Sequence, residues 1–228
     1  MSHSLCEERP CVFIGPSLPL DEARLLIDAD FRPPVRRGDL ATLDPARFVV
    51  IIDGEFHQSF SVSPNEILRL LDLGGTVVGA SSMGALRAAE LADFGMIGLG
   101  WVFAAYYEGV IVGDDEVALA YCPFGLQALT VPVVNVRHWL SRIESAGLID
   151  AAASARVLRR ARQVFYADRT PERLNEVVAT ALGPERYAQI RGSSLAEIDD
   201  VKAADARLAL TSVGRWGKVR QHQRSQAL

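Results

Sequence analysis

The segment ASSMG (residues 80–84) holds the residues best suited to chemistry in this chain of 228 residues. It lies between an apolar run and an amphipathic run, a pattern that predicts a strand turning directly into a helix. Small residues on both sides of a serine permit a nucleophile elbow, in which the serine is held out and the next amide helps to bind an oxyanion. By this interpretation Ser82 is the nucleophile and the Met83 amide is one oxyanion donor.

Two simpler interpretations of the same turn stay open. Either Ser81 or Ser82 would satisfy free amides of the helix as its N-cap. Alternatively, the hydroxyls and amides at the helix start would bind an anionic group without attacking it. A hydroxyl nucleophile also needs a base, and His57, which follows the neighbouring strand, is a candidate. The interpretation that the sequence favours for His57 is a histidine of a surface loop.

Carboxylates and arginines near the same turn are further candidates. Asp53 ends a strongly apolar run, and a carboxylate at a strand end can act as a base or orient one. Arg87 and Glu90 share one helix face, either as a plain ion pair or with Glu90 as a second candidate base and Arg87 aimed at the helix start.

Two loops in the first quarter of the chain supply candidate binding groups. Arg36 and Arg37 follow two prolines, and their forked donors would clamp a carboxylate or thiocarboxylate, unless the loop is merely solvated. Ser17 follows a Gly-Pro turn after the first strand and joins Ser81 among the candidate binding residues. The acidic run 114–116 has no histidine near it, so an acidic first helical turn explains it better than a metal site does.

The arrangement of these segments predicts an α/β fold. Buried strands are expected at 11–14, 48–52 and 76–80, and they alternate with helices at 20–29, 65–73 and 85–91. This alternation predicts an open, mostly parallel sheet flanked by helices and followed by an α-helical C-terminal region. Ligands of such sheets bind beyond the carboxyl ends of the strands, which here are the loops 15–17, 53–57 and 81–84. We predict an α/β core over 11–122, a helical cap or subdomain over 130–213 and a flexible tail over 214–228.

The composition restricts the classes of function. The net charge of −4 gives no reason to expect nucleic-acid binding. No apolar run reaches the length of a membrane span, and the first ten residues do not resemble a signal peptide. Three cysteines without zinc-like spacing predict neither disulfides nor a structural metal. We therefore expect a cytoplasmic protein that needs neither a metal nor another cofactor.

Several stretches together resemble the TfuA-like family. They are VFIGPSLP (12–19), PPVRRGDL (33–40), IIDGEF (51–56), GASSMGALRAAELADFGMIGLG (79–100) and EGVIVGDDEVAL (108–119), which together cover most of residues 11–120. The helical half contributes almost no recognisable motif. One departure is that Pro64 and Asn65 stand before Glu-Ile-Leu, where the family pattern has His-Lys, so any role of those two side chains is absent here.

The resemblance implies a role in peptide backbone thioamidation, as in the biosynthesis of thioamidated ribosomal peptides. It implies a YcaO enzyme as partner, which uses ATP to activate a peptide amide oxygen, and a ubiquitin-like sulfur carrier ending in Gly-Gly-COSH. The implied activity is a hydrolysis of this thiocarboxylate that releases sulfide for the YcaO enzyme. The alternative is a non-catalytic adaptor that docks the carrier or the substrate peptide onto the YcaO enzyme and activates it.

Overall fold

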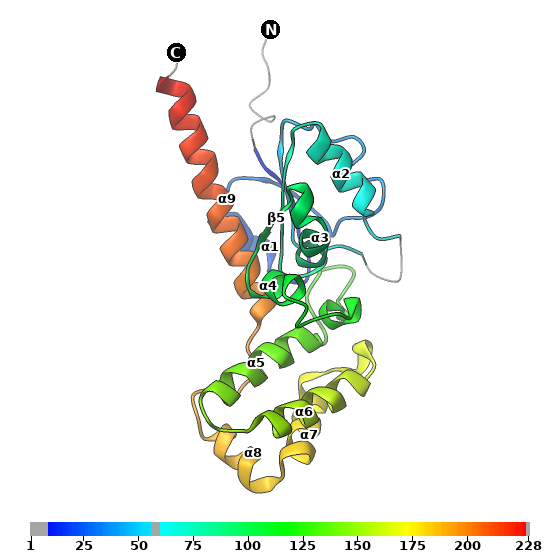
Figure 1. Ribbon diagram of the computed structural model, residues 1–228, viewed down its shortest axis with the longest axis vertical. Helices are drawn as coiled ribbons and strands as arrows, with labels where there is room; N and C mark the ends of the chain where they lie inside the picture. The colour runs from blue at the N-terminus through cyan, green and yellow to red at the C-terminus, as the bar shows by residue number, and fades with distance from the viewer. Residues whose placement is uncertain (1–8, 56–59, 227–228) are drawn as a thin grey trace. The chain divides into compact units, whose positions relative to one another are not determined.

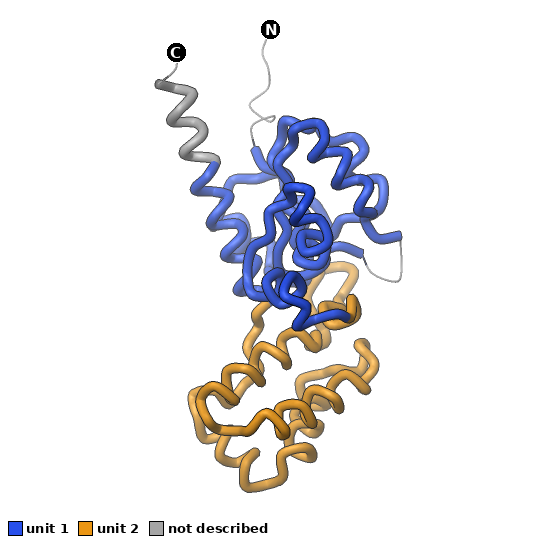
Figure 2. The backbone as a smooth tube through the Cα atoms, in the orientation of Figure 1, with its two compact units in different colours: residues 1–112, 202–228 blue, residues 113–201 orange. Residues whose placement is uncertain are grey.

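The chain divides into two compact units. The computed structural model describes residues 9–55 and 60–226, with side chains as far as residue 216. The first unit comprises residues 1–112 together with 202–228, and the second comprises residues 113–201 (Figure 2). The second unit is therefore an insertion into the first. Residues 202–213, predicted as part of the helical region, and residues 214–228, predicted as a tail, both belong to the unit of the sheet in this division.

The first unit is built on a five-stranded parallel sheet, which confirms the predicted α/β fold (Figure 1). Its strand order is β2-β1-β3-β4-β5. The strands are β1 (Cys11–Phe13), β2 (Asp30–Arg32), β3 (Phe48–Ile51), β4 (Thr76–Ala80) and β5 (Ile97–Leu99). The chain thus runs from β1 to β2 on one side and returns to β3 on the other. The strand order reverses between β1 and β3, the place where open α/β sheets form a ligand crevice.

Helices cover both faces of the sheet. On one face, α2 (Pro64–Asp72) and α3 (Met83–Leu91) pack with the side chains of Phe13 and Ile51. On the other face, α1 (Leu20–Leu26) and α9 (Val201–Gln226) pack with those of Val50 and Ile52. Neighbouring residues of β3 are therefore buried on opposite faces, which is why this strand reads as an unbroken apolar run.

The start of α2 follows directly from its sequence. The Ser63 hydroxyl accepts a hydrogen bond from the Glu66 amide, and the Glu66 carboxylate accepts one from the Ser63 amide. Pro64 stands at the first helical position, where the missing N–H has no acceptor to lose. This capping box confirms the predicted helix start and explains why a short helix begins sharply there.

The helix α9 packs on the sheet although it is far from the strands in the sequence. The chain leaves β5 through α4 (Trp101–Tyr107) and returns only at Val201. The buried Asp205 then accepts hydrogen bonds from the amides of Trp101 and Val102, at 2.9 and 2.7 Å. The last helix of the chain therefore caps α4 and holds it to the same unit.

The second unit is helical around its own core. Its helices are α5 (Val133–Ser145), α6 (Ala151–Gln163), α7 (Pro171–Leu182) and α8 (Pro184–Arg191), and short 3₁₀ turns precede α5 and α7 (Asp114–Val117 and Tyr166–Asp168). The buried carboxylate of Glu116 accepts two hydrogen bonds from Arg137, at 2.6 and 2.8 Å. The acidic run 114–116 therefore binds an arginine of the same unit. Among residues 9–55 and 60–226, no group of three or more His, Cys, Asp or Glu side chains is placed to hold a metal ion.

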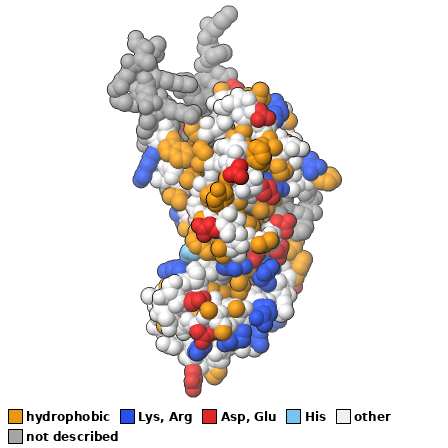
Figure 3. Space-filling view, in the orientation of Figure 1, with side chains coloured by type: hydrophobic (Ala, Val, Ile, Leu, Met, Phe, Trp, Pro, Cys, Tyr) orange, Lys and Arg blue, Asp and Glu red, His pale blue; other side chains and the backbone are white. Residues whose placement is uncertain are grey.

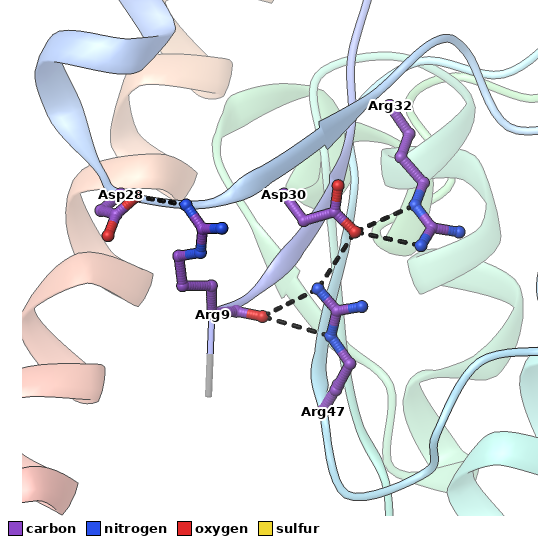
Figure 4. Close-up of polar contacts among 5 residues, drawn as sticks. All are labelled: Arg9, Asp28, Asp30, Arg32 and Arg47. Carbon is purple, nitrogen blue, oxygen red and sulfur yellow. Dashed lines mark hydrogen bonds and ion pairs between the residues drawn. The ribbon is translucent and has the colours of Figure 1, made fainter. Parts of the chain in front are cut away.

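A polar cluster holds the strands together at the edge where they begin (Figure 4). Asp30 at the start of β2 accepts hydrogen bonds from Arg32 and from Arg47, which precedes β3. Arg47 also donates to the carbonyl oxygen of Arg9, which precedes β1. The cluster thus links the three strands β2, β1 and β3 at one edge and leaves the opposite edge for the loops.

None of the described helices is both long and apolar enough to cross a membrane.

We predict that Asp30→Asn lowers the stability of the first unit in a pH-dependent way. Partial burial raises the pKa of Asp30, but hydrogen bonds and charges of Arg32 and Arg47 outweigh it, and the net pKa is lowered. Its ionic contribution is therefore complete above the unfolded pKa of about 4 and disappears as pH falls through the folded pKa. Because the carboxylate is partly exposed, we expect a loss of about 1 kcal/mol or less at pH 7.

Urea denaturation of the wild type and of Asp30→Asn between pH 7 and pH 2 measures this difference. A gap between the two proteins that stays constant over the whole range would contradict the ionic origin of the effect.

Candidate active site

Asp53 joins the loops of β1 and β3 at the carboxyl edge of the sheet. One carboxylate oxygen accepts the Ser17 hydroxyl at 2.6 Å, and the other accepts the amides of Gly15 and Ser17 at 2.9 and 3.1 Å. Asp53 and Ser17 are both buried. The sequence predicted that these two loops share one edge, but it did not indicate that the carboxylate would bind the opposite loop. The contact lies between β1 and β3, where the strand order reverses.

Next to this contact, β4 turns into α3 through a strained residue. Ser81 has φ of +70°, in the left-handed region that non-glycine residues seldom adopt. The amide of Ser82 donates back to the Ala80 carbonyl at 2.8 Å, which closes a tight three-residue turn around Ser81. The Ser81 hydroxyl is fully buried and donates to the carbonyl oxygen of Lys202 in α9. Strain of this kind persists only where the surroundings fix the backbone.

The turn leaves Ser82 at the start of α3 without using its hydroxyl as a cap. Ser82 occupies the N-cap position, yet its side chain accepts no capping hydrogen bond. Because Ser81 is bonded to Lys202, neither serine plays the N-cap role that the simpler interpretation assigned to them. In a nucleophile elbow the strained residue is itself the nucleophile, whereas here the strained residue is structural and Ser82 follows it.

The first amides of α3 differ in what they bind. The Gly84 amide donates to the Ile52 carbonyl, and those of Ala85 and Leu86 donate to the Ser82 carbonyl. For the Met83 amide, no acceptor is found among residues 9–55 and 60–226. The side chain of Met83 is buried in the core beside Gly54. The Met83 amide is therefore the donor of this turn that a ligand oxygen could use.

A close approach of α3 to β3 fixes this geometry. A Cβ at position 84 would collide with the Ile51 carbonyl oxygen, and one at position 54 would meet the Met83 side chain. Glycine at both positions therefore lets the start of the helix lie directly on the end of β3. Because Ile51 pairs with Gly79 in the parallel register, Asp53 and Ser81 follow on adjacent strands.

The two candidate arginines have separate surroundings. The half-exposed Arg36 forms an ion pair of 3.0 Å with the buried carboxylate of Glu55. The guanidinium of Arg37 lies over the Phe60 ring, 4.8 Å from its centroid. The segment around Arg36 runs beside the end of β3, because Val35 and Gly54 form a parallel bridge. Arg36 is thus brought to the site edge, whereas Arg37 turns to an exposed aromatic ring.

Sequence reasoning missed Glu55 in this site. Glu55 stands two residues after Asp53. In an extended segment, side chains two residues apart lie on the same side, so the spacing from Asp53 could have identified Glu55 as a candidate. Its burial beside Arg36 places a second carboxylate at the same edge.

The other predicted residues are not brought together. Glu90 lies eight residues after Ser82 in the same helix, or about 12 Å along its axis. Arg87 donates to the Val62 carbonyl and pairs with Glu90, so these two residues join α3 to the segment before α2. No hydrogen bond links any two of Ser82, Asp53 and Arg36 within the described residues, although all three belong to one edge. His57 lies outside the described residues.

The strain at Ser81 yields a prediction about stability. Ser81→Ala removes the hydrogen bond to Lys202 and keeps the strained φ, so we expect a loss of about 1–2 kcal/mol. Ser81→Gly removes the same bond but relieves the strain, which is worth about 1–3 kcal/mol. We therefore expect Ser81→Gly to be the more stable variant, by about 1 kcal/mol or more. Urea denaturation of both variants compares them, and equal or reversed stabilities would show that the turn stores no strain.

Comparison with known proteins adds a family to this geometry. A search of curated proteins finds no match. The family model described as TfuA-like protein matches residues 53–170, slightly more than half of the chain. The match begins at Asp53, includes Ser82 and continues into the second unit, and the family is linked to YcaO-associated systems. The chain therefore belongs to the TfuA-like family.

Proposed function

We propose that this protein releases sulfide by hydrolysing the thiocarboxylated C-terminus of a ubiquitin-like sulfur carrier, for use by a YcaO enzyme. The observation that carries this proposal is the turn between β4 and α3, in which the strained Ser81 precedes Ser82 and the Met83 amide has no acceptor among the described residues. Membership of the TfuA-like family supports the broader role in thioamidation.

The proposed reaction has two steps. The Ser82 oxygen attacks the thiocarboxylate carbon, the C–S bond breaks, and the serine proton leaves with the sulfur, giving an ester of Ser82 and HS⁻. Water then hydrolyses the ester to the carrier carboxylate, a proton and free Ser82. The tetrahedral oxyanion of each step would be bound by the Met83 amide at the positive end of the α3 dipole.

Asp53 and Ser17 form the acid–base group of this proposal. The Ser17 hydroxyl donates to Asp53 at 2.6 Å. Ser17 would accept the proton of the attacking Ser82 hydroxyl as it passes its own to the Asp53 carboxylate, and the carboxylate would return that proton through Ser17 to the departing sulfur. Both residues belong to the edge that holds Ser82, and the sheet keeps them in place. Arg36, half-exposed and paired with Glu55, would hold the carrier terminus through its free guanidinium donors.

The cysteine in β1 is poorly suited to carry the sulfur instead. Burial, the largest influence, raises the pKa of the Cys11 thiol to about 11. A thiol in that state is protonated at neutral pH, and the thiolate is the reactive form. Cys11 also lies at the start of β1, far along the strand from the edge that holds Ser82. A persulfide on Cys11 is therefore no part of the proposal.

The adaptor remains a second candidate, because specific observations favour it. Within the described residues, Ser82 is not hydrogen-bonded to Asp53 or to Arg36, as a preassembled catalytic group would be. Each unit also exposes large apolar side chains, including Phe94 and Val112 in the first and Phe124 in the second, and such side chains suit protein contacts.

Sulfide release from a carrier thiocarboxylate tests the proposal. The full-length protein is assayed with and without the YcaO enzyme. We expect Ser82→Ala to lower the rate at least 100-fold and Asp53→Asn to lower it at least 10-fold, because each removes a group that acts on the reacting atoms. Ser145→Ala, which removes an exposed hydroxyl from the second unit, is the matched control and should retain the wild-type rate. Circular dichroism shows whether each variant is folded.

The outcomes separate the two candidates. A carrier adduct on the wild type, absent from Ser82→Ala in mass spectrometry, would identify the ester. A full rate in folded Ser82→Ala would remove Ser82 from the mechanism. No release under any condition, together with tight binding to the YcaO enzyme, would exclude the hydrolase and leave the adaptor.

A further inference from the structure

The helix α6 carries an exposed row of arginines in the second unit. Arg156, Arg159 and Arg160 are three and four residues apart, so they lie on one face of this helix. All three are exposed, and none forms an ion pair or a side-chain hydrogen bond with another residue that the structure describes. We call these three residues the arginine row. The opposite face of α6 packs into the core through Ala153, Val157 and Ala161.

The arginine row differs from an ordinary solvated helix face. Helices usually place acidic residues three or four positions from basic ones, and these pairs stabilise the helix, whereas like charges at these spacings repel. No acidic residue occurs anywhere between Ala151 and Gln163. The carboxylate nearest in the sequence, Asp150, caps the helix through the Ala153 amide, pairs with Arg186 and also interacts with the charge of Arg156. No carboxylate within the helix therefore offsets the repulsion among the three arginines.

Other arginines of the same unit show the contrast. Arg137 and Arg162 pair with the buried Glu116, and Arg173 pairs with Glu176. The fold of this unit therefore provides carboxylates for its structural arginines. None of the three residues of the row has an ion pair among the described residues, and Asp150, already paired with Arg186, acts on Arg156 only through its charge. Most of the charge of the row is therefore available to something outside the chain.

We propose that the arginine row is the docking surface for a short acidic segment of a polypeptide. This inference goes beyond the proposed function and does not depend on the hydrolysis. In an extended peptide, alternate side chains lie on one side about 7 Å apart. Arg156 and Arg160 are about 6 Å apart along the helix axis, so two such carboxylates reach both.

The charges around the row favour a short segment over a long polyanion. Residues 113–201 contain ten arginines, no lysine and twelve aspartates or glutamates, so the row is a local excess in an acidic unit. Figure 3 shows blue side chains gathered on one side of this unit, with red ones elsewhere on the same surface. A nucleic acid or an anionic membrane would extend over those carboxylates and be repelled by them.

An exposed aromatic side chain follows the arginine row in the sequence. Phe165 follows the end of α6, is 60 % exposed and contacts the Tyr166 ring, with 4.5 Å between the ring centroids. Arginine and aromatic side chains are the residue types that contribute most to protein interfaces. We therefore expect the bound segment to carry an apolar residue beside its acidic ones.

Fluorescence anisotropy with the full-length protein tests the proposal. The probe is a labelled twelve-residue peptide in which every third residue is Phe and the others are Glu. The test variant is Arg156→Gln/Arg159→Gln/Arg160→Gln. The control is Arg24→Gln/Arg69→Gln/Arg215→Gln, which removes three exposed arginines from three other helices and changes the net charge equally. We expect the test variant to bind the probe at least tenfold more weakly and the control to remain within twofold of the wild type.

The stability of the test variant distinguishes docking from a structural role, because the loss of structural arginines would lower the melting temperature. Glutamine and arginine have similar helix propensities, and the change removes the repulsion, so the melting temperature of the test variant should equal or exceed that of the wild type. A melting temperature that falls together with the affinity would overturn the proposal. So would equal affinity of the test and control variants for the peptide. Tighter binding of a twelve-nucleotide single-stranded DNA, or of phosphatidylserine vesicles, than of the peptide would overturn it in favour of that ligand.

Discussion

The three hydrogen bonds that Asp53 accepts hold the carboxyl edge of this sheet together. They fix the loop after β1 to the end of β3, at the point where the strand order reverses. Because these donors are buried, loss of the carboxylate would leave two amides and a hydroxyl without an acceptor. The loops of this edge can present functional groups in fixed positions only while this contact exists.

The last helix supplies the second constraint. α9 packs on the same face of the sheet as α1, and its first turns reach the carboxyl edge, where the Lys202 carbonyl accepts the Ser81 hydroxyl and Asp205 caps α4. The strained turn before Ser82 is therefore held by a residue 121 positions later in the chain. This contact joins two segments of the first unit that are separated in the sequence by the whole of residues 113–201. This long sequence separation predicts a slow closing step in folding.

Much of the fold could be predicted from the sequence because its strongest signals are local. The apolar runs of β1, β3 and β4 are patterns of a few adjacent residues, and all three were recognised. β2 and β5 were missed, since each has only three residues and none of the six is fully buried. The resemblance was assigned to residues 11–120, whereas the family match covers 53–170 and so includes helices in which no motif had been recognised.

The details of the site depend on contacts that no local pattern encodes. Ser81 and Ser82 are identical in type and adjacent in sequence, and the partner that separates their roles, Lys202, belongs to a distant helix. Asp53 likewise has its partners 36 and 38 residues earlier in the chain. Because a buried hydroxyl bonded to a carbonyl cannot also attack a substrate, the distant partner removes Ser81 from the chemistry. The same contact holds the turn that presents Ser82, so a single hydrogen bond both excludes one serine and positions the other.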